Sequence, residues 1–244
     1  MTAYTRALNF DASNEWVNAG SASAIDNMTA FTVGVLYRAT GTTGGAIIQK
    51  RNLTTGWRVL ANNNGRLDVS WTRSTTQALT FFSGGVTLGN AWTWLFVTFD
   101  QANGTNIFAC RRGPYNGTLT TVSPGTNQVG SGTWADDSAI NLSVGSSVSG
   151  ESALRPMDVA FVGLWPSVLS SATIDTYASD MTANGGLTAA TDYFLIDSTM
   201  GSSATSGKSV FTGTYNGSIA LVSGPDFTNS NAPRSMHYSL NGMR

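Results

Sequence analysis

The sequence has few of the residues that enzymes and metal sites use most often. It contains one cysteine, one histidine and two glutamates in 244 residues, and charged residues make up only 11% of the chain, against a usual share of about a quarter. The single Cys110 excludes an intramolecular disulfide, and the single His237 excludes a multi-histidine metal site and argues against a Ser-His-Asp triad. We therefore expect a surface of Ser, Thr, Asn and Gly, which suits contact with hydroxyl-rich ligands or with another protein.

Long apolar runs are also missing. No stretch approaches the ~20 apolar residues of a membrane span, and the N-terminal MTAYTRALNF has no apolar signal-peptide core. The net charge is −1, so no global field attracts nucleic acid or an anionic membrane. These features predict a cytoplasmic site of synthesis, no nucleic-acid partner and no membrane insertion.

Closely spaced acids, which glycoside hydrolysis needs about 5–10 Å apart, are not evident either. Glu15 and Glu151 stand far apart in the chain. Asp136 and Asp137 are adjacent, so in a strand their side chains would point to opposite faces. The sequence therefore favours a non-enzymatic protein with no catalytic residues.

What the chain does contain is a series of short strand-like runs. Hydrophobic residues make up 41% of the sequence, enough for a substantial core, and Gly- and Asn-rich turns separate the runs. WTWLFVTF is apolar on both faces, which predicts a central strand between two layers. The runs that we expect to be strands are 31–38, 46–51, 56–61, 66–71, 92–99, 106–111, 140–145, 158–165 and 192–197.

One helix is predicted after Leu169. Ser170 or Ser171 can cap it, and its apolar face consists of Ile174, Tyr177, Ala178 and Met181. A helix of this length fits a lid on the edge of a β-sandwich.

A short repeat, YNGTLTTVS at 115–123 and YNGSIALVS at 215–223, recurs about a hundred residues apart. Asn-Gly favours a tight type I′ turn, and no other similarity survives at this offset. We therefore interpret each copy as a hairpin turn that enters a strand, and not as a duplicated domain or a paired ligand site.

Several longer segments resemble the concanavalin-A-like, laminin-G-like jelly-roll family. They are ALNFDASNEWVNAG (7–20), FTVGVLYRATG (31–41), WTWLFVTFDQANGTNIFACRRG (92–113) and MDVAFVGLWPSVLSSATI (157–174). The resemblance extends over roughly residues 7–227. It implies an all-β fold of two packed antiparallel sheets with one short helix, in which residues 1–227 form one domain and residues 228–244 a polar tail. Lectins, glycosidases, adhesion modules and bacteriophage surface proteins share this fold, so the fold itself indicates little about activity.

Two kinds of ligand site can be considered within this fold. Exposed aromatic side chains can stack on sugar rings, and Trp57, Tyr115 and Trp134 are the aromatic residues that we expect in loops, whereas Trp71, Trp92, Trp94 and Trp165 fall in apolar runs. Laminin-G-like domains often hold calcium, and Asp11, Asp136 and Asp137 are the oxygen donors that could bind it. We expect no cofactor to be required. The alternatives are that these aromatic residues pack against the rest of the protein and that these acids lie in solvated turns.

Contacts with a partner protein are a further option. Arginine is enriched at interfaces, and Arg111 and Arg112 belong to a set of arginines that hairpins could bring together. In the tail, Met236, Tyr238 and Leu240 alternate with polar residues, as a strand added to the edge of a neighbouring sheet would. A solvated polar face and a disordered end are the alternatives.

Taken together, these features favour a structural or adhesive component of a particle. The leading hypothesis is a bacteriophage virion protein (decoration, fibre or tail-surface protein) that lies on the virion surface, with other virion proteins and copies of itself as partners. The alternative is a lectin that binds a glycan, such as one on a host surface, through its loop aromatics.

Overall fold

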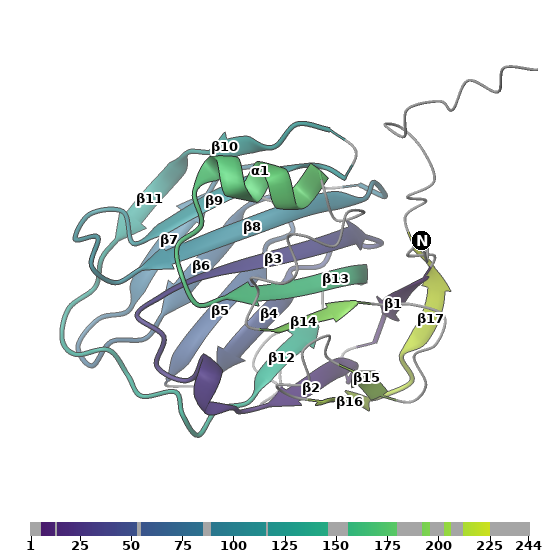
Figure 1. Cartoon of the computed structure of the whole chain (residues 1–244), viewed down its shortest axis with the longest axis horizontal. Helices are drawn as coiled ribbons and strands as arrows, with labels where there is room; N and C mark the ends of the chain where they lie inside the picture. The colour runs from purple at the N-terminus through teal and green to yellow at the C-terminus, as the bar shows by residue number, and fades with distance from the viewer. Residues whose placement is uncertain are drawn as a thin grey trace, which may run out of the picture.

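Two antiparallel β-sheets pack face to face and enclose the main core (Figure 1). The computed structural model describes residues 6–12, 14–52, 55–84, 89–115, 117–145, 156–179, 192–195, 203–205 and 212–224. Within these residues, one sheet has eight strands and the other has nine. The two-sheet jelly roll with one short helix, expected from the sequence, is confirmed.

The eight-stranded sheet has the order β10-β9-β8-β3-β13-β1-β17 across the described residues, and β14 also pairs with β13. β1 pairs with the first half of β13, and β14 pairs with its second half. The bounds are β1 Arg6–Phe10, β3 Ala30–Ala39, β8 Thr93–Asp100, β9 Phe108–Pro114, β10 Thr120–Val122, β13 Met157–Trp165, β14 Asp192–Leu195 and β17 Ala220–Ser223.

The nine-stranded sheet has the order β11-β7-β6-β5-β4-β12-β2-β16-β15 across the same residues. The bounds are β2 Trp16–Gly20, β4 Gly45–Arg51, β5 Gly56–Ala61, β6 Leu67–Trp71, β7 Ala78–Phe82, β11 Pro124–Gln128, β12 Leu142–Gly145, β15 Ser203–Thr205 and β16 Thr212–Asn216. A single-turn 3-10 helix, η1 (Ser23–Ile25), precedes β3.

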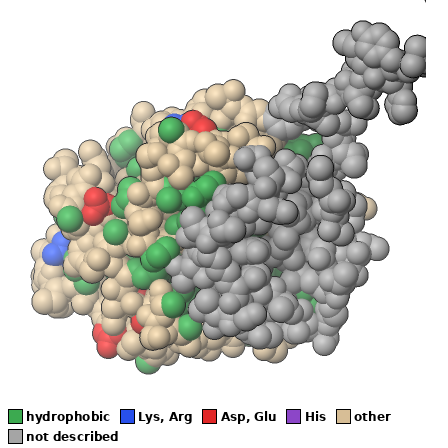
Figure 2. Space-filling view, in the orientation of Figure 1, with side chains coloured by type: hydrophobic (Ala, Val, Ile, Leu, Met, Phe, Trp, Pro, Cys, Tyr) green, Lys and Arg blue, Asp and Glu red, His purple; other side chains and the backbone are tan. Residues whose placement is uncertain are grey.

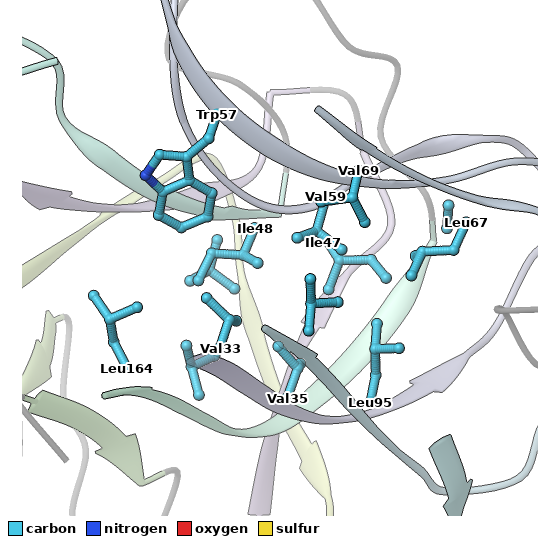
Figure 3. Close-up of a cluster of buried hydrophobic side chains, with 14 of the residues drawn as sticks. Val33, Val35, Ile47, Ile48, Trp57, Val59, Leu67, Val69, Leu95 and Leu164 are labelled. Carbon is cyan, nitrogen blue, oxygen red and sulfur yellow. The ribbon is translucent and has the colours of Figure 1, made fainter. Parts of the chain in front are cut away.

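The core between the sheets is rich in aromatic and β-branched side chains. Figure 3 shows how valine, isoleucine and leucine side chains from both sheets fill the space between them, with Trp57 beside Ile48. Trp57 lies in β5 and is 1% exposed, 4.9 Å from the ring of Phe31. The expectation that Trp57 is exposed in a loop is therefore wrong. The tryptophans that the sequence placed in apolar runs are buried, as expected: Trp71, Trp92, Trp94 and Trp165.

A second apolar cluster lies on the outer face of the eight-stranded sheet, where α1 (Ser171–Ser179) packs (Figure 1). The hydroxyl of Ser170 accepts a hydrogen bond from the Thr173 N–H at 3.1 Å, which confirms the predicted cap. Ile174 and Ala178 are buried against this cluster, as their spacing predicts. Met181 lies outside the described residues. Because β8 faces both clusters, its apolar character on both faces is explained.

The two YNG turns have different roles. The first joins β9 to β10, which pair as a hairpin. The second joins β16 to β17, and these strands belong to different sheets, because β17 pairs with β1 and β16 with β2. Gly217 has φ +80°, as a tight turn requires. The second copy is therefore not a hairpin, since the turn is local whereas the pairing of the next strand depends on tertiary contacts.

The visible surface is mostly uncharged. Among the described residues on this face, Figure 2 shows few acidic or basic side chains, surrounded by uncharged side chains and backbone, in agreement with the 11% of charged residues. No helix among the described residues has the length and apolar character needed to cross a membrane.

Candidate functional site

A groove of about 430 Å³ lies at one end of the sandwich, where β6 and β8 end and β3 begins. Its apolar lining includes Trp71 and Phe99, which are buried in the core. Its polar lining includes Asn27, Gln101 and Asp136, which come from three separate connections. The half-buried Trp134 completes it. The groove thus combines aromatic surface with hydrogen-bonding side chains.

The indole of Trp134 is held in place on several sides. Its ring meets Trp71 edge to face at 5.9 Å and Phe99 edge to face at 5.3 Å. The guanidinium of Arg73 lies 4.5 Å from the ring centroid, and it donates hydrogen bonds to the carbonyls of Val129 (3.2 Å) and Gly132. Trp134 is therefore a preorganised aromatic surface at the groove, although it belongs to a long connection between β11 and β12.

Asn27 joins two loops that lie 110 positions apart in the sequence. Its backbone N–H donates to Oδ1 of Asp137 at 2.7 Å, and its side-chain amide donates to Oδ1 of Asp136 at 2.8 Å. Its own Oδ1 accepts from the Asp137 N–H at 3.0 Å. Asn27 has φ +51°, a conformation that Asn tolerates better than most residues. The clamp fixes the positions of both acids.

A buried ionic cluster adjoins the groove through Asp137, which follows the lining residue Asp136 and accepts from Asn27. The ammonium of Lys50, which is fully buried, lies 3.1 Å from Oδ1 of Asp137 and 2.9 Å from Oδ1 of Asp26. It also donates to the backbone carbonyl of Asp137. Asp137 is itself fully buried, and its Oδ2 has no hydrogen-bond partner. The cluster anchors the groove loops to β4.

The two neighbouring acids have opposite pKa shifts. Hydrogen bonds from the Ser138 backbone and the Asn27 amide lower the pKa of Asp136 from its ordinary 3.8 to about 2. Burial raises the pKa of Asp137 above its ordinary value, and this effect exceeds the opposing effects of the Asn27 N–H and of Lys50. Asp136 is exposed at the rim and ionised at neutral pH.

The calcium site predicted from the sequence is not assembled. Asp11 lies in the turn that follows β1, at the other end of β2 from the groove. Asp137 is buried and pairs with Lys50, whose ammonium occupies the position where a cation would need to bind. Among the described residues, no three His, Cys, Asp or Glu side chains are grouped to hold a metal ion. Asp11 and Asp136 are exposed, in agreement with the alternative that they are solvated turn residues.

The three aromatic residues predicted for glycan binding do not converge on one site. Trp134 lines the groove, Trp57 is buried in the core, and Tyr115 packs against the outer cluster beside α1. Sequence reasoning missed Asn27 and Gln101, because a single amide in a polar turn carries no signal until its spatial neighbours are known.

The predicted arginine pair is also divided. Arg111 lies 2.5 Å from Asp175 of α1 and donates to the Leu119 carbonyl. Arg112 follows it in β9, so the two side chains leave the strand on opposite faces. They therefore do not form one patch. Met236, Tyr238 and Leu240 lie outside the described residues.

No protein-family model matches the sequence, and no curated protein matches it either. Among solved structures, the chain is similar to a protein from Bacteroides ovatus that is described as a candidate carbohydrate-binding protein, with a TM-score of 0.63 and 14% identity. The match covers 90% of this chain and 60% of that protein, so the chain spans less than two thirds of its length.

Two further solved structures align less closely. They are the CBM40 domain of the Ruminococcus gnavus IT-sialidase (TM-score 0.47, 12% identity, 72% of this chain and 99% of that one) and a heptameric pentraxin from Limulus polyphemus (TM-score 0.44, 10% identity, 72% and 82%). The likeness to the Bacteroides protein shows the fold, a jelly-roll sandwich of two antiparallel sheets.

Proposed function

We propose that the chain is a non-catalytic carbohydrate-binding domain and that the Trp134 groove receives the sugar. The observation that carries the proposal is the arrangement of a fixed, half-buried indole beside an exposed carboxylate and an amide in one open groove. Ligand sites commonly pair an apolar or aromatic wall with a few placed polar groups. The apolar face of a pyranose ring can stack on the indole, and its hydroxyls can pair with the polar groups.

Each lining residue has a distinct role in this proposal. Trp134 provides the stacking surface. Gln101, on the turn after β8, has an amide that can both donate to and accept from sugar hydroxyls. The carboxylate of Asp136 accepts hydrogen bonds from hydroxyls, since a carboxylate has lone-pair sites beyond those used by Asn27 and Ser138. Asn27 positions Asp136 and does not need to contact the ligand.

The fold adds support by analogy. The Bacteroides ovatus protein, which shares the fold, is described as a candidate carbohydrate-binding protein. Fold alone does not determine function, so the groove remains the main argument.

The experiment is a glycan-array screen followed by titration of the glycans that bind. We expect Trp134→Ala to abolish binding and Gln101→Ala to weaken it by about fivefold or more, as loss of one hydrogen-bonding side chain would. Gln101 lies in a surface turn, so its variant keeps the fold even if Trp134→Ala loosens the core. Tyr115→Ala, an aromatic on another face, is the matched control and should bind as the wild type does. Full binding by both groove variants, or no glycan bound by the wild type, would overturn the proposal.

A particle context for this binding domain remains a separate proposal. The scarcity of surface charge (Figure 2) favours packing against other protein surfaces, as in a bacteriophage decoration, fibre or tail-surface protein. A virion protein could use the same groove to bind a host-surface glycan. Mass spectrometry of purified particles from the source genome tests this, and absence of the chain from them would end the proposal.

Self-association through the tail is likewise a proposal. Light scattering on the full chain and on a chain that ends at Phe227 measures it directly. A defined oligomer that dissociates on truncation would identify residues 228–244 as an assembly arm, whereas two monomers would contradict this.

A further inference from the structure

We infer that the groove selects neutral sugars and excludes those with a carboxylate, such as uronic acids and terminal sialic acid. This inference rests on the proposed function and specifies the class of sugar that the same groove accepts. Two independent observations carry it: a fixed negative charge at the rim, and the absence of Lys, Arg and His from the described residues that line the groove.

The fixed negative charge is the carboxylate of Asp136. It is exposed, it lines the groove, and its Oδ1 is held by the Asn27 amide at 2.8 Å and by the Ser138 N–H at 2.9 Å. Because these bonds stabilise the ionised form, the pKa of Asp136 is about 2. The group therefore keeps its charge throughout the range in which glycans are bound, and the clamp prevents it from turning away from a ligand.

The cations nearest the groove are already engaged by groups of the protein itself. Among the described residues that line the groove there is no Lys, Arg or His. Lys50 is fully buried and already engaged by Asp26 and Asp137. Arg73 stacks on Trp134 and donates to backbone carbonyls. Neither cation is among the residues that line the groove, and both already have partners within the protein.

The balance of these charges decides which sugars can bind. Carboxylate ligands are bound best by charge-assisted hydrogen bonds from Arg, Lys or clustered N–H groups. Here a sugar carboxylate would approach another carboxylate in a partly desolvated groove, where like charges repel. A neutral hydroxyl can instead donate to Asp136. We therefore expect an acidic sugar to bind at least about tenfold more weakly than its neutral counterpart.

The test compares neutral sugars with acidic counterparts, which carry either a carboxylate in place of a hydroxymethyl group or an added sialic acid. Methyl glucoside is paired with methyl glucuronide, methyl galactoside with methyl galacturonide, and lactose with 3′-sialyllactose, each titrated by calorimetry or by NMR at about 0.1 M salt. The wild type should bind the neutral member of at least one pair, and its affinity for the acidic member should be about tenfold or more lower. This difference in affinity is the gap that the variants test. Asp136→Asn, which keeps the shape and the Asn27 bond, should narrow this gap several-fold. Salt at about 1 M should also narrow it by screening an exposed charge.

Asp11→Asn is the matched control. It removes one exposed acid from the far end of β2, five residues or roughly 17 Å of strand away, beyond the Debye length of about 10 Å at moderate salt. It should leave the gap unchanged. Equal or tighter binding of the acidic sugars by the wild type, or a gap that Asp136→Asn does not narrow, would overturn this inference and leave carbohydrate binding intact. Failure to bind any member of any pair, together with a blank glycan array, would overturn both.

Discussion

The ammonium of Lys50 lies 3.1 Å from Oδ1 of Asp137, and neither side chain is exposed to solvent. A buried ion pair of this kind contributes little net stability, because both groups lose their hydration, yet removing one partner leaves an uncompensated buried charge. Since Asp137 also accepts a hydrogen bond from the Asn27 N–H, this pair links the loop that holds Asn27 to strand β4.

Lys50→Met should strongly destabilise the fold. The apolar side chain leaves Asp137 without its countercharge, and we expect the free energy of unfolding to fall by about 3–5 kcal/mol, measured by urea denaturation. Arg66→Met is the control, because Arg66 pairs with Asp68 at 2.7 Å but is 37% exposed. Arg66→Met should lower the free energy of unfolding by about 1 kcal/mol or less. Equal losses in the two variants would contradict the burial argument.

The two adjacent acids should give opposite dependences of stability on pH. The pKa of Asp136 is lowered to about 2 in the folded protein, so its contribution is present above its ordinary 3.8 and is lost as pH falls from about 4 to 2. The pKa of Asp137 is raised by burial, so its ionisation reduces stability as pH rises above 3.8. The urea midpoint of Asp136→Asn should therefore fall less than that of the wild type when the pH is lowered from about 4 to 2. The urea midpoint of Asp137→Asn should fall less than that of the wild type when the pH is raised from acid to neutral. The same pH profile for both variants would show that the assigned shifts are wrong.

Gly56→Ala should destabilise the fold through the backbone. Gly56 has φ +91°, and an added Cβ would lie 1.9 Å from the carbonyl oxygen of Lys50. We expect a loss of more than about 2 kcal/mol. Gly104→Ala is the matched control, because an added Cβ there meets nothing within 4 Å. Thermal denaturation compares the two, and similar melting temperatures would contradict the close backbone approach at the β4–β5 hairpin.

Cys110 should be unreactive in the folded protein. It is 1% exposed, and burial raises the pKa of its thiol to about 12, so very little thiolate forms at neutral pH. A maleimide reagent should label Cys110 only when the protein unfolds, and the labelling rate should rise with the concentration of denaturant. Rapid labelling of native protein would show that this strand is accessible.

Most strands could be predicted from the sequence because alternation is a local signal. The run at 56–61 coincides with β5, yet the exposure expected for Trp57 was wrong. Its cross-strand partners are Lys50 and Trp71, and these place it on the core face. Which face a side chain occupies at a strand end depends on such pairing, which the run itself does not reveal.

The candidate site was less predictable, for two physical reasons. A register shift between Ala46 and Ile48 changes the alternation in β4, so that Lys50 faces inward, and a bulge of this kind has no clear sequence signature. Asn27 gains its role only from Asp136 and Asp137, far along the chain. Trp134 was a candidate because it was expected in a loop, and the structure places it in the connection between β11 and β12, where it lines the groove.

The most direct test of the account follows the indole N–H resonances of the seven tryptophans by ¹⁵N NMR while a neutral glycan from the array is added. Trp134→Phe assigns the resonance of Trp134. We predict that this resonance shifts in a saturable manner, with smaller changes at Trp71, which shares the groove, and none at Trp165, buried on the outer face of the other sheet. Saturable shifts confined to tryptophans away from the groove, or none with any glycan, would contradict the account.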